Sequence, residues 1–152
     1  MEKEQIYQTI LNQLESLLEN EHDLIANMAN AASILYHNLH NVNWAGFYLY
    51  KENELVLGPF QGKVACMHIP IGKGVCGTSA LTKSIVRVDD VHQFPGHIAC
   101  DSASNSEIVI PIIKKNTLIG VLDIDSNIFS CFNSIDEYYL QSFVDILINH
   151  MK

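Results

Sequence analysis

Two apolar segments joined by a short polar turn decide the fold. They read Glu107-Ile-Val-Ile-Pro-Ile-Ile113, then Lys114-Lys-Asn116, then Thr117-Leu-Ile-Gly-Val-Leu-Asp-Ile-Asp125. Branched side chains such as Ile and Val favour strands because they pack well on a pleated surface. A turn this short joins antiparallel strands, whereas parallel strands need a long crossover. The stretch therefore predicts an antiparallel β-hairpin.

An earlier part of the chain predicts a second hairpin. Residues 43–51 alternate with a period of two, which places Trp44 and Tyr48 on one face and Phe47 on the other. Aromatic residues at this period are typical of a strand. Residues 54–57 follow after a short polar turn, so the two segments pair as neighbours.

Helices are predicted at both ends of the chain. Apolar residues recur at spacings of three and four near the N-terminus, at Ile6, Ile10, Leu14, Leu17 and Leu18. Asp23 is a candidate N-cap for a second helix. Ser134 is expected to cap the last helix, with Glu137 completing a capping box. Residues 75–82 resemble a short helix, and residues 84–88 a short strand.

This order of elements predicts one α+β domain spanning residues 1–152. We expect a central, mostly antiparallel sheet with the N- and C-terminal helices packed on one face. Residues 89–106 form a long polar stretch, and loops of this length are usually functional. We expect the active-site loops on the opposite face of the sheet.

The composition excludes several classes of function. Lys and Arg total 9 against 17 Asp and Glu, a formal net charge of −8. Proteins that bind nucleic acid or acidic membranes usually carry a basic patch, and no such cluster occurs. No apolar run approaches the roughly 18 residues of a membrane span, and the N-terminus has no signal-peptide core. We therefore expect a cytoplasmic protein without stable structural disulfides.

Residues 72–77 match the pattern G-x-G-x-x-G. In dinucleotide-binding folds this pattern lies between a parallel strand and a helix. Here a hairpin precedes it, and Pro70 interrupts the supposed strand. We favour a turn whose glycines allow close approach of the backbone, and the dinucleotide hypothesis stays as an alternative.

Three of the four cysteines, Cys66, Cys76 and Cys100, are predicted in loops or at the ends of elements. Reactive groups concentrate there, so thiol chemistry is one hypothesis. Buried packing is the alternative for each. A zinc site that adds His97 to these three thiols is another alternative, based on ligand type alone. Cys131 lies beside aromatic residues and is interpreted as packing.

Carboxylates end the decisive hairpin. Asp123 and Asp125 are two residues apart, so a strand places both side chains on one face. Glu107 begins the neighbouring strand. Such a pair could bind an ammonium group, and a half-buried Glu107 would have a raised pKa and could donate a proton. Simple solvation of these acids is the alternative.

These stretches together resemble the free methionine-R-sulfoxide reductases, a family of GAF-domain enzymes. The resemblance covers nearly the whole chain. It rests on Asn43-Trp-Ala-Gly-Phe-Tyr-Leu-Tyr50, Leu57-Gly-Pro-Phe-Gln-Gly-Lys-Val-Ala-Cys66, Ile71-Gly-Lys-Gly-Val-Cys-Gly-Thr78, His97-Ile-Ala-Cys-Asp-Ser102, Ser106-Glu-Ile-Val-Ile-Pro111 and Gly120-Val-Leu-Asp-Ile-Asp-Ser126.

The resemblance implies a role for each thiol. Cys100 resembles the nucleophile, and Cys66 the cysteine that resolves oxidised Cys100 as a redox-active disulfide. Cys76 resembles an auxiliary thiol or second resolver, so the choice between Cys66 and Cys76 stays open. Cys131 is not a motif cysteine of the family.

It also implies a substrate site. Trp44 and Tyr48 resemble the aromatic wall of the pocket, and Glu107, Asp123 and Asp125 the acidic residues that hold and activate free methionine sulfoxide.

The resemblance implies an oxidoreductase that repairs oxidative damage. Thioredoxin would reduce its disulfide after each cycle, and no cofactor or metal is required. The family is often dimeric, which makes a homodimer a candidate state. The competing hypothesis is a GAF sensor domain that binds a small molecule without turnover.

Overall fold

The computed structural model describes residues 2–97 and 103–151. Six strands form one sheet in the order β3-β2-β1-β6-β5-β4, and every pairing described is antiparallel. Four α-helices and one 3-10 turn complete the described part. In chain order the elements are α1 (Lys3–Leu18), α2 (Leu24–Asn38), β1 (Val42–Lys51), β2 (Glu54–Gly62), β3 (His68–Pro70), α3 (Gly74–Thr82), β4 (Val86–Val88), η1 (Val91–Gln93), β5 (Ser106–Lys114), β6 (Thr117–Ser126) and α4 (Ser134–Asn149).

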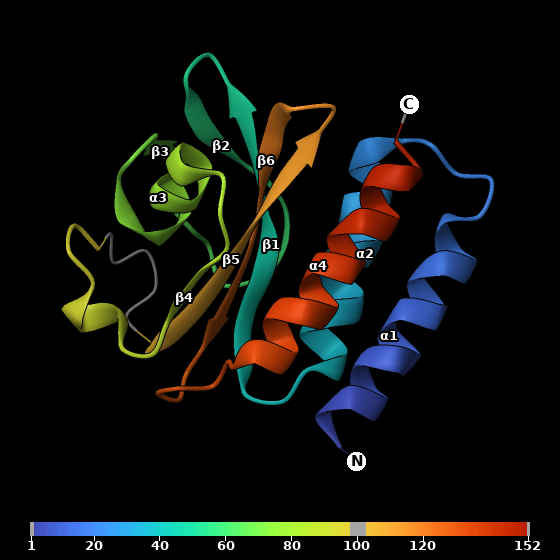
Figure 1. The fold of residues 1–152 in the computed structure, drawn as a ribbon, viewed down its shortest axis with the longest axis horizontal. Coiled ribbons are helices and arrows are strands. Elements are labelled where there is room, and N and C mark those ends of the chain that lie inside the picture. The colour runs from blue at the N-terminus through green and yellow to red at the C-terminus, as the bar shows by residue number, and fades with distance from the viewer. Residues whose placement is uncertain (1, 98–102, 152) are drawn as a thin grey trace.

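The two faces of the sheet carry different layers. Helices α1, α2 and α4 lie together on one side, and α3 lies on the other with the chain around β3 and η1 (Figure 1). Helix α2 packs on β1 and β2, α4 packs on β5, and α1 packs against both helices. The predicted α+β fold, with the terminal helices on one face, is confirmed.

The larger core lies between the sheet and the helices. Alternate residues of the central strands point into it, such as Phe47 of β1, Ile108 of β5 and Leu122 of β6. The same alternation sends Trp44 and Tyr48 to the opposite face, as the period-two pattern predicts. Each central strand therefore contributes to both sides of the sheet.

The structure corrects several boundaries. Strand β2 extends to Gly62 rather than ending at Leu57, and β4 includes only Val86–Val88. Strand β3 was not predicted, because Pro70 argued against a strand there. It pairs only with β2 at the edge of the sheet, where proline is tolerated. Leu17, predicted on the buried stripe of α1, is 45% exposed.

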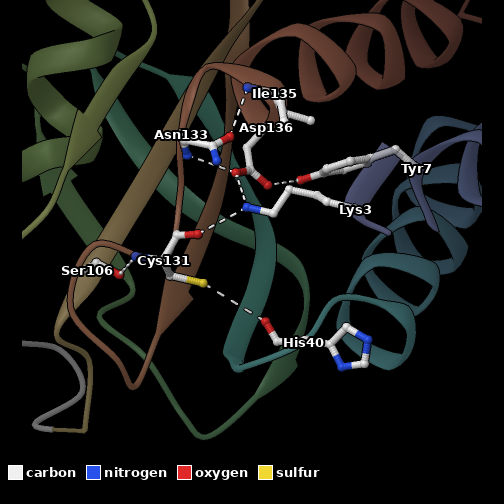
Figure 2. Close-up of polar contacts among 8 residues, drawn as sticks. All are labelled: Lys3, Tyr7, His40, Ser106, Cys131, Asn133, Ile135 and Asp136. Carbon is white, nitrogen blue, oxygen red and sulfur yellow. Dashed lines mark hydrogen bonds and ion pairs between the residues drawn. The ribbon is translucent and has the colours of Figure 1, made fainter. Parts of the chain in front are cut away.

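The cap of α4 lies one residue earlier than predicted. The side chain of Asn133 accepts a hydrogen bond from the backbone N of Ile135 at 2.9 Å, and Asp136 Oδ2 accepts from the backbone N of Asn133 at 2.8 Å. Both Asn and Ser are good N-caps, so the sequence allowed either register. Lys3 Nζ lies 2.7 Å from Asp136 Oδ2, and Tyr7 also donates to Asp136, which ties α1 to the start of α4 (Figure 2).

Cys131 lies beside this cap, on the helix side of the molecule (Figure 2). It is a free, half-buried thiol that packs against the helix-side core. Its carbonyl accepts a hydrogen bond from Lys3 Nζ at 3.2 Å, and its backbone N donates to Ser106 Oγ at 3.3 Å. The interpretation of Cys131 as a packing residue is confirmed.

Among the described residues, no helix is long and apolar enough to cross a membrane.

Candidate active site

A cavity opens on the face of the sheet opposite the terminal helices. Residues from β1, β3, β5, β6, α3 and the loops beside them line it: Trp44, Tyr48, Ala65, Ile69, Lys73, Gly74, Val75, Cys76, His97, Ser104, Glu107, Asp123 and Asp125. Six of the eight predicted site residues are in this set. Cys66 packs against the apolar cluster on the same face. The predicted nucleophile, Cys100, lies outside the described residues.

Sheet register brings the three carboxylates together. Glu107 of β5 pairs directly with Asp125 of β6, and Asp123 pairs with Val109, two residues further along β5. Glu107 is 7% exposed and Asp123 is 5% exposed, while Asp125 is half-buried. The hypothesis that these strand-end acids are simply solvated is therefore wrong.

Burial sets the protonation of this cluster. Loss of solvent raises the pKa of Glu107 well above its ordinary value, and the charges of Asp123 and Asp125 raise it further. Burial and the charge of Asp123 likewise raise the pKa of Asp125. Burial raises the pKa of Asp123 too, although hydrogen bonds from Glu107 and Cys76 oppose the shift. Like charges this close cannot all ionise, so the site holds protons that it can donate.

Cys76 belongs to the same cluster. It lies in the first turn of α3, is 4% exposed, and its Sγ donates to Glu107 Oε2 at 3.9 Å. Burial raises the pKa of the Cys76 thiol, and the charges of Asp123 and Glu107 raise it further. Cys76 is therefore a neutral thiol in this site, whereas a nucleophile must be a thiolate.

Aromatic rings form one wall of the cavity. The rings of Trp44 and Tyr48 stack with centroids 5.9 Å apart, and Phe60 stacks on Trp44 at 5.2 Å. Trp44 Nε1 donates to the Lys63 carbonyl at 3.1 Å, and the Tyr48 hydroxyl donates to the Cys66 carbonyl at 3.0 Å. Burial and the charge of Asp123 raise the pKa of Tyr48, so its hydroxyl remains a donor. These bonds fix both rings.

The glycine-rich turn positions Cys76. Gly72 and Gly74 have φ values of 87° and 63°, which residues other than glycine rarely adopt. A Cβ at Gly77 would lie 2.5 Å from the carbonyl oxygen of Pro70. The interpretation as a turn of close backbone approach is confirmed. Because no described strand pairs in parallel, the dinucleotide hypothesis is wrong.

The thiols differ in state as well as position. Cys76 and Cys131 are free, whereas Cys66 is disulfide-bonded. A Cys66 sulfur held in a disulfide cannot also act as a metal thiolate. The alternative zinc site that needed Cys66 is therefore incomplete in this state.

Ser104 and His97 line the cavity but are not among the eight predicted site residues. Ser104 Oγ donates to Asp125 Oδ2 at 3.2 Å, and no signal in the sequence pointed to this contact. His97, considered above only as a ligand of the alternative zinc site, lines the cavity as well. Partial burial and the charge of His92 lower the pKa of His97. His97 is the first residue of one of the stretches that resemble the family, and this was the signal that could have identified it.

Comparison with known proteins identifies this arrangement. A family model described as GAF domain matches residues 2–150. The free methionine-R-sulfoxide reductase of Escherichia coli is 50% identical over 144 residues, which cover 95% of this chain and 87% of that protein.

Solved structures agree with the sequence comparison. The fRMsr of Staphylococcus aureus in complex with substrate has 51% identity and a TM-score of 0.91, covering 95% of this chain and 94% of that one. The free methionine-R-sulfoxide reductase of Neisseria meningitidis, also in complex with its substrate, has 43% identity and a TM-score of 0.95, covering 99% and 90%. The predicted resemblance is thus confirmed, and the chain belongs to the GAF-domain family of free methionine-R-sulfoxide reductases.

Proposed function

We propose that this chain reduces free methionine-R-sulfoxide to methionine in the cavity described above. The observation that carries the proposal is a set of three carboxyl groups, two buried and one half-buried, that face an aromatic wall beside redox-capable thiols. The reductases of Escherichia coli and Neisseria meningitidis, similar over most of this chain, support it.

The carboxylates suit the amino-acid part of the substrate. Asp123 and Asp125 would bind the α-ammonium group of the substrate. Its positive charge would stabilise the ionised carboxylates, whose pKa values burial otherwise raises. Trp44 would contact the S-methyl group through apolar surface. A methionine sulfoxide within a peptide lacks the free ammonium group, so the same pocket would exclude it.

The first chemical step needs a nucleophile and an acid. Cys100 would attack the sulfoxide sulfur as a thiolate and form an S–S bond. This bond and the S–O bond of the substrate would then break as the oxygen bonds to the Cys100 sulfur. Glu107, whose pKa is raised by burial, would protonate that oxygen. Methionine leaves, and Cys100 becomes a sulfenic acid. The sulfoxide is reduced by two electrons and the thiol is oxidised by two.

A second thiol would complete the cycle. We assign resolution to Cys66, which condenses with the Cys100 sulfenic acid to form a disulfide and release water. The disulfide-bonded state of Cys66 and the free, buried state of Cys76 support this choice. Cys76 would instead serve as a neutral hydrogen-bond donor to Glu107. Thioredoxin, a dithiol reductant, would restore both thiols in the cytoplasm. A homodimer stays a candidate assembly state.

A coupled assay tests the proposal. Purified protein is mixed with free methionine-R-sulfoxide, thioredoxin, thioredoxin reductase and NADPH, and the loss of NADPH is followed. We expect turnover with the free amino acid and none with its N-acetyl derivative, which lacks the ammonium group. A folded protein that binds free methionine-R-sulfoxide without consuming NADPH would instead be a GAF sensor domain, and the proposal would be wrong.

A further inference from the structure

Three side chains of different chemistry converge on one point of the cavity. One ligand atom each from Cys76, Glu107 and Asp123 lies within 4.8 Å of the other two, and all three residues are buried. They come from the first turn of α3 and from the two neighbouring strands β5 and β6. Each is therefore held by a regular element rather than by a loop tip.

The cluster has acceptor capacity that the described protein does not use. Asp123 Oδ1 and Asp125 Oδ1 are buried, and neither accepts a hydrogen bond from the described residues. Asp123 is 95% buried, since its exposed fraction is 5%. Buried polar atoms normally have partners, so an unused carboxylate oxygen indicates a ligand that supplies positive charge or a donor.

The ligand types distinguish among cations. Magnesium and calcium prefer all-oxygen sites, whereas zinc accepts thiolate and carboxylate together. Zinc binds sulfur at about 2.3 Å and carboxylate oxygen at about 2.0–2.2 Å, usually with four ligands. Ligand atoms less than 4.8 Å apart can converge on such an ion through small side-chain movements. Half-buried Asp125 or water can complete the coordination.

We propose that Cys76, Glu107 and Asp123 form a reversible binding site for one thiophilic divalent cation of the zinc class. The cation displaces the thiol proton of Cys76 to solvent and takes up the unused oxygen of Asp123. Because Asp123 is also the residue proposed to bind the substrate ammonium group, cation and substrate exclude each other. Only this exclusion rests on the proposed function. The cation site itself does not.

The experiment uses two full-length variants that each keep a single cysteine. In the first, Cys66, Cys100 and Cys131 are replaced by Ser, which leaves Cys76. In the matched control, Cys66, Cys76 and Cys100 are replaced, which leaves Cys131, the half-buried thiol outside the cavity. Cadmium ion is titrated into each, and the ultraviolet sulfur-to-cadmium charge-transfer band is measured. Circular dichroism verifies that both variants are folded.

We expect one cadmium ion per chain in the Cys76 variant, bound at least roughly tenfold more tightly than in the Cys131 variant. Adding Asp123→Asn should weaken the binding by a further factor of about ten. Equal affinities in the two single-cysteine variants would overturn the proposal. So would an unchanged affinity after Asp123→Asn, because the thiol would then bind cadmium without the cluster.

A competition in the same Cys76 variant tests the exclusion, because this variant lacks Cys100 and cannot turn over. Glycine is the control, because it chelates cadmium through the same amino and carboxylate groups. Free methionine-R-sulfoxide should reduce the charge-transfer band more than glycine does at equal concentration. Equal effects of the two would overturn the exclusion while the cation site stands. The failure of the substrate proposal is thus distinguishable from the failure of the cation proposal.

Discussion

The two faces of the central sheet are built from the same strands and have opposite chemistry. On β6, Leu122 points into the helix-side core, and its neighbour Asp123 points into the cavity. On β5, Ile108 and Glu107 divide in the same way. One face gains stability by burying apolar surface. The other buries groups that lose hydration, which costs stability unless a ligand compensates.

Removing the proposed nucleophile should affect the two faces most unequally. Cys100→Ser should lower turnover of free methionine-R-sulfoxide by about a thousandfold or more, because no other thiol on the cavity face would replace the attacking sulfur. The matched Cys131→Ser variant changes a thiol on the helix side and should keep normal turnover. The NADPH-coupled assay measures both. An active Cys100→Ser variant would move the nucleophile elsewhere.

Stability should respond in the opposite way on the two faces. Leu122→Ala leaves a cavity in the sealed core and should lower the free energy of unfolding by about 2–5 kcal/mol. Asp123→Asn removes a buried charge beside two other acids and should leave that free energy unchanged or raise it. Urea denaturation measures both. If Asp123→Asn destabilises as much as Leu122→Ala, the cavity face supports the fold rather than only the site.

Glu107→Gln tests the proton donor. The amide is nearly isosteric but cannot protonate the leaving oxygen, so kcat should fall by about a hundredfold. The proposed ammonium ligands, Asp123 and Asp125, are retained, and KM should change much less. Steady-state kinetics separates the two parameters. A large rise in KM at constant kcat would assign Glu107 to binding instead.

The pH dependence of stability tests the same residue without catalysis. Burial raises the pKa of Glu107 above its ordinary 4.5, so the folded state retains a proton that the unfolded state releases. Its stabilisation is present below pH 4.5 and is lost as pH rises through the raised pKa. As pH rises through that range, the free energy of unfolding of the Glu107→Gln variant should therefore fall less than that of the native chain. Urea midpoints at several pH values measure this, and parallel curves would contradict it.

The smallest expected effect concerns the aromatic wall. Tyr48→Phe removes the hydroxyl that donates to the Cys66 carbonyl, which should cost about 1 kcal/mol of unfolding free energy. Tyr50→Phe removes an exposed hydrogen bond to Asn53 and should cost less. Urea denaturation compares the two variants. An equal cost would mean that the Tyr48 bond does not stabilise the segment around Cys66.

Sequence reasoning succeeded where one strand contains the whole pattern. The period of two placed Asp123 and Asp125 together, and Trp44 with Tyr48, because neighbouring side chains of a strand alternate between faces. Burial of Glu107 beside Asp125 depends on the pairing register of two strands. The hairpin predicted the pairing but did not by itself fix which residues are opposite each other.

Features that depend on distant segments were beyond the local pattern. The contact between Cys76 and Glu107 joins residues 31 positions apart and requires α3 to be folded back by the turn after β3. Strand β3 itself was missed because Pro70 is acceptable only at a sheet edge, and edge position is a tertiary property. Asn133 rather than Ser134 is the N-cap of α4, and the sequence could not distinguish them because both residues favour this position equally.

Direct pairing of Glu107 with Asp125 also has a consequence for how the chain finds its fold. Sliding β5 by one residue along β6 would turn its side chains to the other face. Glu107 would then enter the apolar layer between β5 and α4, and Ile108 would face the cavity. Such a misaligned hairpin would place an unpaired acid among apolar side chains, a heavy energetic penalty. The acids of the cavity thus favour the native register of β5 and β6 during folding, independently of any substrate.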